Sequence, residues 1–310
     1  MWLQLKPHSD MLYPKRLFLS AIVLTLALLH HSCNKEDVDT EERRDVATQY
    51  QEDDEALISY LKTHFYNYED FQQAPDDYSL RIQIDTIAGE NANKTSLFEQ
   101  IKSKSIDVLG SNDEIIAHNL YYIVVREGKG EHPSVVDSTF VRYRGNLLDG
   151  SVFDNTELPV WFNLPEVVVG FRESLPELGA GRFEENQDGT FTFFDYGQGL
   201  IFMPSALGYY SRAQSGIPSY SPLVFSISLF TMKATDHDGD SILSRDEDID
   251  GDGNPFDDDT DDDGRANMYD SDDDGDGVLT RDEIDRDENG VPGDSDNDGI
   301  PNFLDPDSAS

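Results

Sequence analysis

Residues 217–225 read Ile217-Pro218-Ser219-Tyr220-Ser221-Pro222-Leu223-Val224-Phe225, and they complete a set of apolar and aromatic positions that begins at Tyr143. Between these points the set continues through Val152-Phe153-Asp154 and Val167-Val168-Val169-Gly170-Phe171. It holds one acid and a few hydroxyls, but no cysteine and no pairing of serine or cysteine with a base. Such a composition suits a cleft that binds and desolvates a substrate, and it argues against nucleophilic attack.

The apolar pattern from Asn119 onward is typical of an antiparallel sheet. Residues 121–125 and 135–145 predict strands, and residues 223–232 alternate strongly, which predicts a closing strand. Asp149-Gly150 is a turn signal. Residues 165–175 have the apolar spacing of a short helix. This order predicts an α+β fold, with an antiparallel sheet of four to six strands wrapped on one short helix.

In residue types and in order, residues 119–233 resemble the FKBP-type peptidyl-prolyl cis-trans isomerases. The resemblance implies a reaction, which is rotation about X-Pro bonds. Amide resonance sets the uncatalysed barrier at about 18–20 kcal/mol. An apolar pocket can lower it by binding the twisted, less polar imide more tightly than the planar one, helped by a few fixed hydrogen bonds. Such catalysis needs neither covalent chemistry nor a cofactor.

The resemblance assigns pocket roles to nine residues of this chain. It makes Phe153 a wall, Asp154 a hydrogen-bond acceptor, and Phe171 the floor, where the family usually has tryptophan. It makes the Tyr209 hydroxyl the donor to a substrate carbonyl. The implied set is Tyr143, Phe153, Asp154, Val167, Val168, Phe171, Tyr209, Ile217 and Phe225.

Three departures from the family pattern bear on activity. The floor residue Phe171 is smaller than tryptophan and lacks an indole N–H. The family's next pocket aromatic is Val160 here, with Trp161 one place away. Extra residues from Phe183 to Leu200 lengthen a hairpin, whose turn we expect at Asn186–Gly189. Each aromatic residue taken singly could be ordinary core, and a degenerate FKBP domain that binds prolyl segments or holds unfolded chains is an alternative.

The charge of the chain is concentrated at its C-terminal end. The 310 residues carry a net charge of −40, and residues 236–307 hold 29 acids against 4 arginines, a net of −25. So acidic a chain should repel nucleic acid and anionic lipid surfaces. It should attract divalent cations.

The acidic tail repeats a pattern of acids at every second position, often followed by glycine. Residues 272–283 match the EF-hand calcium loop throughout the pattern. Similar loops start at residues 236, 248, 259, 285 and 294, too close together for flanking helices. The candidate calcium ligands are Asp236, Asp238, Asp240, Glu247, Asp259, Asp261, Asp263, Asp270, Asp272, Asp274, Asp276, Glu283, Asp294, Asp296, Asp298 and Asp305.

Overlapping loops of this kind resemble thrombospondin type 3 repeats, although the cysteines of that family are absent. The resemblance implies a chain that wraps a row of calcium ions with almost no hydrophobic core. We expect the tail to be disordered without metal, because its self-repulsion is large and its burial small. A disordered acidic tail that binds no calcium is the alternative.

The N-terminal region resembles a bacterial lipoprotein signal. Lys15-Arg16 precede an apolar run, Leu17–Leu29, which is the length of a signal-peptide core and too short to span a bilayer comfortably. Cys33, the only cysteine of the chain, follows closely and is the predicted lipidation site. The alternative is a short membrane anchor with an incidental thiol. Residues 34–37 resemble a signal for the cell surface, or form a plain charged linker; the true start could be Met11.

We expect five segments along the chain. These are a signal peptide (1–32), a charged tether (33–56), an N-terminal extension (57–115), an FKBP-type domain (116–234) and calcium-binding repeats (235–307). Within the extension, residues 55–66 and 97–101 predict helix and residues 80–84 a strand. The expected protein is a lipid-anchored isomerase of the outer membrane, on its periplasmic face or at the cell surface, that acts on proline-containing polypeptides. A non-catalytic scaffold with a calcium-stiffened spacer is the alternative.

Overall fold

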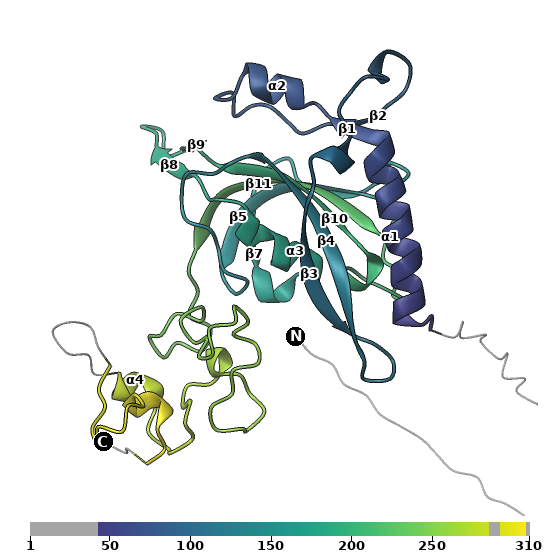
Figure 1. Ribbon diagram of the computed structural model, residues 1–310. Coiled ribbons are helices and arrows are strands. Elements are labelled where there is room, and N and C mark those ends of the chain that lie inside the picture. Colours follow the sequence, from purple (N-terminus) through teal and green to yellow (C-terminus); the bar gives the residue numbers. More distant parts are fainter. Residues whose placement is uncertain (1–42, 285–291, 308–310) are drawn as a thin grey trace, which may run out of the picture. The chain divides into compact units, whose positions relative to one another are not determined.

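The computed structural model describes residues 43–284 and 292–307 and confirms the expected α+β class (Figure 1). The helices are α1 (Val46–Thr63), α2 (Tyr68–Gln73), α3 (Val169–Ser174) and α4 (Thr280–Glu283). The strands are β1 (His64–Tyr66), β2 (Ile84–Thr86), β3 (Lys102–Leu109), β4 (Ile115–Arg126), β5 (Ser138–Asn146), β6 (Val152–Asn155), β7 (Val160–Asn163), β8 (Arg182–Glu185), β9 (Phe191–Phe194), β10 (Gly197–Met203) and β11 (Leu223–Lys233). Short 3-10 turns lie at Gly89–Asn91, Leu97–Glu99, Leu164–Glu166, Leu175–Glu177, Ser205–Leu207, Asn267–Tyr269 and Asn302–Leu304.

Within the described residues the central sheet has seven strands, more than the four to six predicted. Its order is β3-β4-β10-β11-β5-β6, with β7 also paired to β5, and its pairs are antiparallel. The unexpected member is β3, which pairs with β4 from Lys102–Tyr122 to Leu109–Ile115. As an edge strand it buries none of its residues fully, so its apolar pattern is too weak to stand out in the sequence.

The sheet separates two hydrophobic cores. One core, on the α3 face, includes Phe171 and Ile201. The other, on the α1 face, includes Leu61 and Phe202. Successive residues of β10 serve opposite cores because side chains alternate along a strand. Figure 1 shows α3 inside the curve of the sheet and α1 along its other side.

The N-terminal part of helix α1 spans residues 46–56, where the sequence predicted a polar tether. Asp45 caps its first turn, accepting from Thr48 N. Its first half buries a single apolar side chain, Val46, beside the polar Gln49 and Asp53, so no helical apolar period marks it. Buried Asp53 accepts hydrogen bonds from Gln49 Nε2 at 2.7 Å and from Ser205 N at 2.7 Å.

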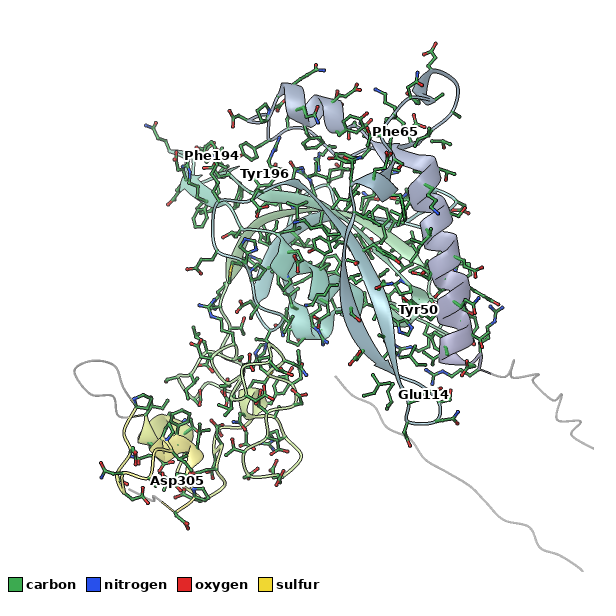
Figure 2. The ribbon with its side chains drawn as sticks, in the orientation of Figure 1. Tyr50, Phe65, Glu114, Phe194, Tyr196 and Asp305 are labelled. Carbon is green, nitrogen blue, oxygen red and sulfur yellow. The ribbon has the colours of Figure 1, made fainter. Side chains whose placement is uncertain are left out.

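A buried histidine lies where α1 meets β4. His118 is fully buried, with Nδ1 2.8 Å from Ile116 O and its ring 4.1 Å from that of Tyr50. Tyr50, on α1, accepts a hydrogen bond from Asn119 N at 3.0 Å (Figure 2). Burial lowers the pKa of His118 because it disfavours the charged imidazolium.

The other local predictions are met in part. The closing strand is confirmed as β11, and residues 121–125 fall inside β4. Of residues 80–84, only Ile84 is in a strand, where β2 pairs with β1. Residues 97–101 form a 3-10 turn instead of an α-helix, and residues 165–175 divide into α3 and two flanking 3-10 turns.

A small apolar cluster joins the acidic tail to the sheet domain. Val135, Val136 and Met268 are buried together, with Phe256 packed against them. The guanidinium of Arg172, on α3, lies 4.4 Å from the centre of the Phe256 ring. The tail is therefore packed on the domain in the described chain, and one of its contacts is made by the short helix α3.

The expected signal peptide and the lipidation site Cys33 lie outside the described residues. Among the residues that are described, no helix combines the length and apolar character needed to cross a membrane.

Candidate functional site

Aromatic rings gather on the α3 face of the sheet. The ring centre of Phe171, which is 3% exposed, lies 5.4 Å from that of Phe225 and 6.1 Å from that of Tyr143, and both contacts are nearly edge to face. Phe153 meets Phe225 at 5.5 Å, also edge to face. These separations are typical of attractive aromatic contacts. The rings thus form one continuous apolar cluster, called the aromatic surface below, drawn from β5, β6, α3 and β11, with Phe171 and Phe225 buried at its centre.

One polar pair lies beside this surface. The Tyr143 hydroxyl donates a hydrogen bond to the Asp154 carboxylate. Burial, and then the Asp154 carboxylate, raise the pKa of Tyr143. Tyr143 therefore stays protonated at neutral pH, and the pair holds a fixed acceptor at the edge of an apolar wall.

The remaining predicted pocket residues reach the same core. Ile217 is buried in it, and Val167, Val168 and Tyr209 pack against it half-buried. Val168 precedes the first turn of α3, and its carbonyl accepts from Phe171 N at 3.0 Å. The structure thus brings all nine predicted residues together on one face of the sheet, although separate segments of the chain supply them.

Two further residues shape the site and were missed in the sequence. Phe162, on β7, has its ring centre 5.5 Å from that of Tyr143 and 5.8 Å from that of Phe171. Its neighbour Trp161 points away, 52% exposed and with its ring centre 5.1 Å from that of Phe140. Side chains alternate between the two faces along β7, which explains the difference. Val160 pairs with Val141, and Phe162 stands two residues further along the strand, on the same face as Val160.

Gly145, on β5, is the second residue that shapes the site and was missed in the sequence. A Cβ on Gly145 would stand 2.4 Å from the ring of Phe153 and 3.0 Å from that of Phe225. The missing side chain therefore lets the two rings lie over β5.

The extra hairpin lies beyond the site. Among the described strands, β8 and β9 form a separate two-stranded sheet, and Gly189 N donates to Asn186 O in the predicted turn. Phe183 and Phe191 remain 53% and 52% exposed. At its base, Tyr196 donates to Tyr78 O at 2.6 Å, and Phe194 and Tyr196 lie at this end of the sheet (Figure 2).

The tail places most predicted ligands in compact acidic groups. Each local group takes alternate acids of one loop, with carboxylate oxygens within 4.8 Å of one another. All four lie in predicted loops, although Asp248, Asp250 and Asp252 were not among the candidate ligands. The local groups are Asp248, Asp250 and Asp252; Asp259, Asp261 and Asp263; Asp272, Asp274 and Asp276; and Asp294, Asp296 and Asp298.

A fifth group is built from two distant loops. Asp238, Asp240 and Glu247 of the first loop are joined by Asp273, which sequence reasoning did not select. Asp240, Glu247 and Asp273 are at most 2% exposed, and oxygens of all four acids are buried without a hydrogen-bond partner. Burial, with neighbouring carboxylates, raises the pKa of Glu247 to about 9 and that of Asp273 to about 8.

Oxygen donors that are buried, converging and without hydrogen-bond partners fit a hard cation such as Ca²⁺. Asp273 was missed because the loop pattern points to alternate positions, and Asp273 stands between two of them. No local sequence pattern predicts that the loop holding Asp273 contacts the loop holding Asp238, Asp240 and Glu247.

Four predicted ligands lie outside the compact groups, namely Asp236, Asp270, Glu283 and Asp305. Asp236 accepts from Gly239 N at 2.7 Å and so shapes its own loop. Asp270 lies 3.5 Å from Arg265 Nη1. Glu283 is 2% exposed, both of its oxygens are buried without a hydrogen-bond partner, and burial raises its pKa to about 7.

Known proteins resemble both parts of the chain. Over 166 residues it is 29% identical to the outer membrane protein MIP of Legionella longbeachae, and the match covers 51% of this chain and 65% of that protein. Over 158 residues it is 29% identical to the FKBP-type peptidyl-prolyl cis-trans isomerase FkpA of Escherichia coli strain K12, covering 50% and 51% respectively. These matches are distant homology to FKBP-type isomerases. The chain spans only about half to two thirds of these relatives.

Among solved structures, FkpA from Escherichia coli is similar at 34% identity with a TM-score of 0.31, covering 37% of this chain and 48% of that one. Residues 237–292 of the tail match a family model described as BamM C-terminal.

Proposed function

We propose that the chain is a peptidyl-prolyl cis-trans isomerase that acts on X-Pro bonds of exported proteins. The observation that carries the proposal is the aromatic surface with the Tyr143–Asp154 pair at its edge, in a chain distantly homologous to FKBP-type isomerases. A prolyl ring would pack on Phe171, between Tyr143 and Phe225. Loss of water around the imide then favours the twisted bond over the planar one, which is more polar.

Two hydrogen-bonding groups would orient the substrate. Tyr209 is half-buried beside the site, and its hydroxyl would donate to a substrate carbonyl. The Asp154 carboxylate would hold Tyr143 in place and accept from the polarised groups of the twisted peptide. Fixed hydrogen-bonding groups act strongly in an apolar site, because little water is present there to compete for their hydrogen bonds.

The proposal also covers the cellular location of the protein and calcium binding by its tail. The protein would be lipid-anchored through Cys33 in the outer membrane, on the periplasmic face or at the cell surface, and its tail would bind Ca²⁺. The outer membrane protein MIP among the relatives and the acidic groups of the tail support these two points. Circular dichroism that does not change when calcium is added to the metal-free protein would contradict the calcium proposal.

The test of the isomerase is catalysed isomerisation of a proline peptide by residues 34–310 in millimolar calcium. We expect the double variant Tyr209→Phe, Asp154→Ala to lose about tenfold or more of the rate enhancement, because each fixed hydrogen bond is worth about 1 kcal/mol. Asp107→Ala, on the exposed face of the edge strand β3, is the matched control and should keep full activity.

A second candidate is a prolyl-binding or chaperone module that turns over slowly, on a calcium-stiffened scaffold. The observation that favours it is the smaller floor, Phe171. Peptide binding without rate enhancement in a folded protein would select this candidate, and Phe171→Trp should then raise the rate.

A further inference from the structure

A cavity lies on the opposite face of the sheet from the aromatic site. It has a volume of about 540 Å³ and is bounded by the extension (Tyr60 and residues 81–84) and by strands β5 and β11. This volume is within the range of small-molecule sites, roughly 300–1,000 Å³. Val224 of the α1-side core reaches it, so the cavity begins where that core ends.

The floor of the cavity is polar and basic. Arg142 and Arg144 stand two apart on β5, on the face opposite Tyr143, and so lie side by side. Across the sheet, Ser228 pairs with Arg142 and Ser226 with Arg144. All four residues line the cavity, together with Arg81 from the extension. Three arginines and two serines from separate segments of the chain therefore line one cavity.

The cavity lining offers these arginines little counter-charge within the described residues. The only acid among the lining residues is Glu157, and within the described residues none of the three arginines forms an ion pair. Arg142 is instead held by neutral groups: its Nη2 donates to Ser228 Oγ at 3.4 Å, and its guanidinium lies 5.2 Å from the Phe230 ring centre.

Such a gathering is unusual in this molecule. The chain has 63 acids against 23 basic residues, so nearby carboxylates are plentiful elsewhere. Adjacent like charges repel, and an anion between them would remove that repulsion. The planar guanidinium is suited to bind two oxygens of one carboxylate or phosphate.

We propose that this cavity binds a small polar molecule through a phosphate or carboxylate group, held by Arg81, Arg142 and Arg144 with the hydroxyls of Ser226 and Ser228. Hydrogen-bonding groups from Asn155 and Tyr60 on the rim would contact the body of the ligand. Tyr143 and Ile227 also border the cavity, but Arg142 and Arg144 alternate with Tyr143 along β5, so their side chains lie on the other face of the sheet from the aromatic rings.

The test is isothermal titration of residues 34–310, in millimolar calcium, with two anions and their neutral counterparts. Glucose 6-phosphate is compared with glucose, and succinate with succinamide. We expect saturable binding of at least one anion and none of the neutral molecules. Preference for glucose 6-phosphate assigns phosphate, preference for succinate assigns carboxylate, and either outcome supports the proposal.

The variant that tests the residues is Arg81→Gln, Arg144→Gln. Both side chains are exposed, so the fold should survive their replacement. Charged hydrogen bonds are strong, and we expect the affinity to fall about tenfold or more. Lys233→Gln, an exposed position at the end of β11 outside the cavity, is the control. Equal affinity in the wild type and the double variant, or no binding of any anion by the folded protein, would overturn the proposal.

Discussion

Replacing Asp273 with asparagine tests whether the tail is held together by a metal shared between two loops. Asparagine keeps the shape of the side chain and one oxygen ligand, but removes one of four negative charges around the site. Asp238, Asp240 and Glu247 of the first loop remain in place. The substitution should therefore weaken calcium binding at this site without disturbing the fold.

The size of the effect follows from the charges. At a usual Ca²⁺–oxygen separation of about 2.4 Å, the attraction between a divalent ion and one carboxylate is about 3.5 kcal/mol even at the dielectric constant of water, ~80. At about 1.4 kcal/mol per tenfold, this fully screened attraction corresponds to a loss of roughly 300-fold. The amide oxygen recovers part of it, so we expect a loss of about 10- to 300-fold at one site.

The metal-free protein should respond in the opposite direction. In the absence of metal, the Asp273 carboxylate is buried beside three others, and burial and repulsion both oppose its charge. The uncharged amide of the variant would relieve that cost. We therefore expect the metal-free Asp273→Asn protein to melt at a higher temperature than the metal-free wild type, and to gain less from calcium.

The assay is calcium titration by calorimetry, beside thermal melts with and without calcium. Asp262→Asn is the control: it removes the same charge from an exposed residue outside the acidic groups, at a positive φ of 58° that asparagine tolerates. If the two variants lose the same affinity, or neither loses any, the shared site does not exist.

Three further predictions follow from the domain. Gly145→Ala should displace the ring of Phe153 and reduce isomerase activity, at a stability cost of about 1 kcal/mol because the ring can swing outward; unchanged activity would separate Phe153 from the site. His118 has its pKa lowered in the folded protein, so only the unfolded chain gains a proton as the pH falls through about 6.5; stability should decline there, and His118→Gln should flatten this part of the melting-temperature profile. Phe256→Ala should lower the calcium-bound melting temperature by removing packing on Met268, worth about 2 kcal/mol; a melt identical to that of the wild type would show that this cluster does not stabilise the protein.

The nine pocket residues were assigned from the family resemblance, and the structure groups them because most are large apolar residues on short, regular strands. Because side chains alternate along a strand, the sequence predicts which of them share a face, as Phe225 and Ile227 do on β11. The same rule would have separated Phe162 from Trp161 if the start of β7 had been known. Strand boundaries depend on pairing with β5, which no local pattern contains.

The parts that could not be predicted depend on contacts between distant residues. The first half of α1 is stabilised through Asp53, whose partner Ser205 lies 152 residues away. Asp273 and the basic cavity arise in the same way, since strands and loops far apart in sequence bring their charges together. Periodicity records which side of an element is buried, but not which polar groups will meet there.

Trp161 gives the domain an optical property of its own. The chain has two tryptophans, and the other is Trp2, inside the expected signal peptide. A chain that starts after that signal would therefore emit from a single indole, half exposed and adjacent in sequence to the site wall Phe162. Because Trp161 points away from the aromatic surface, its emission would report on the exposed side of β7 beside Phe140, with no label attached and no second indole in the acidic tail.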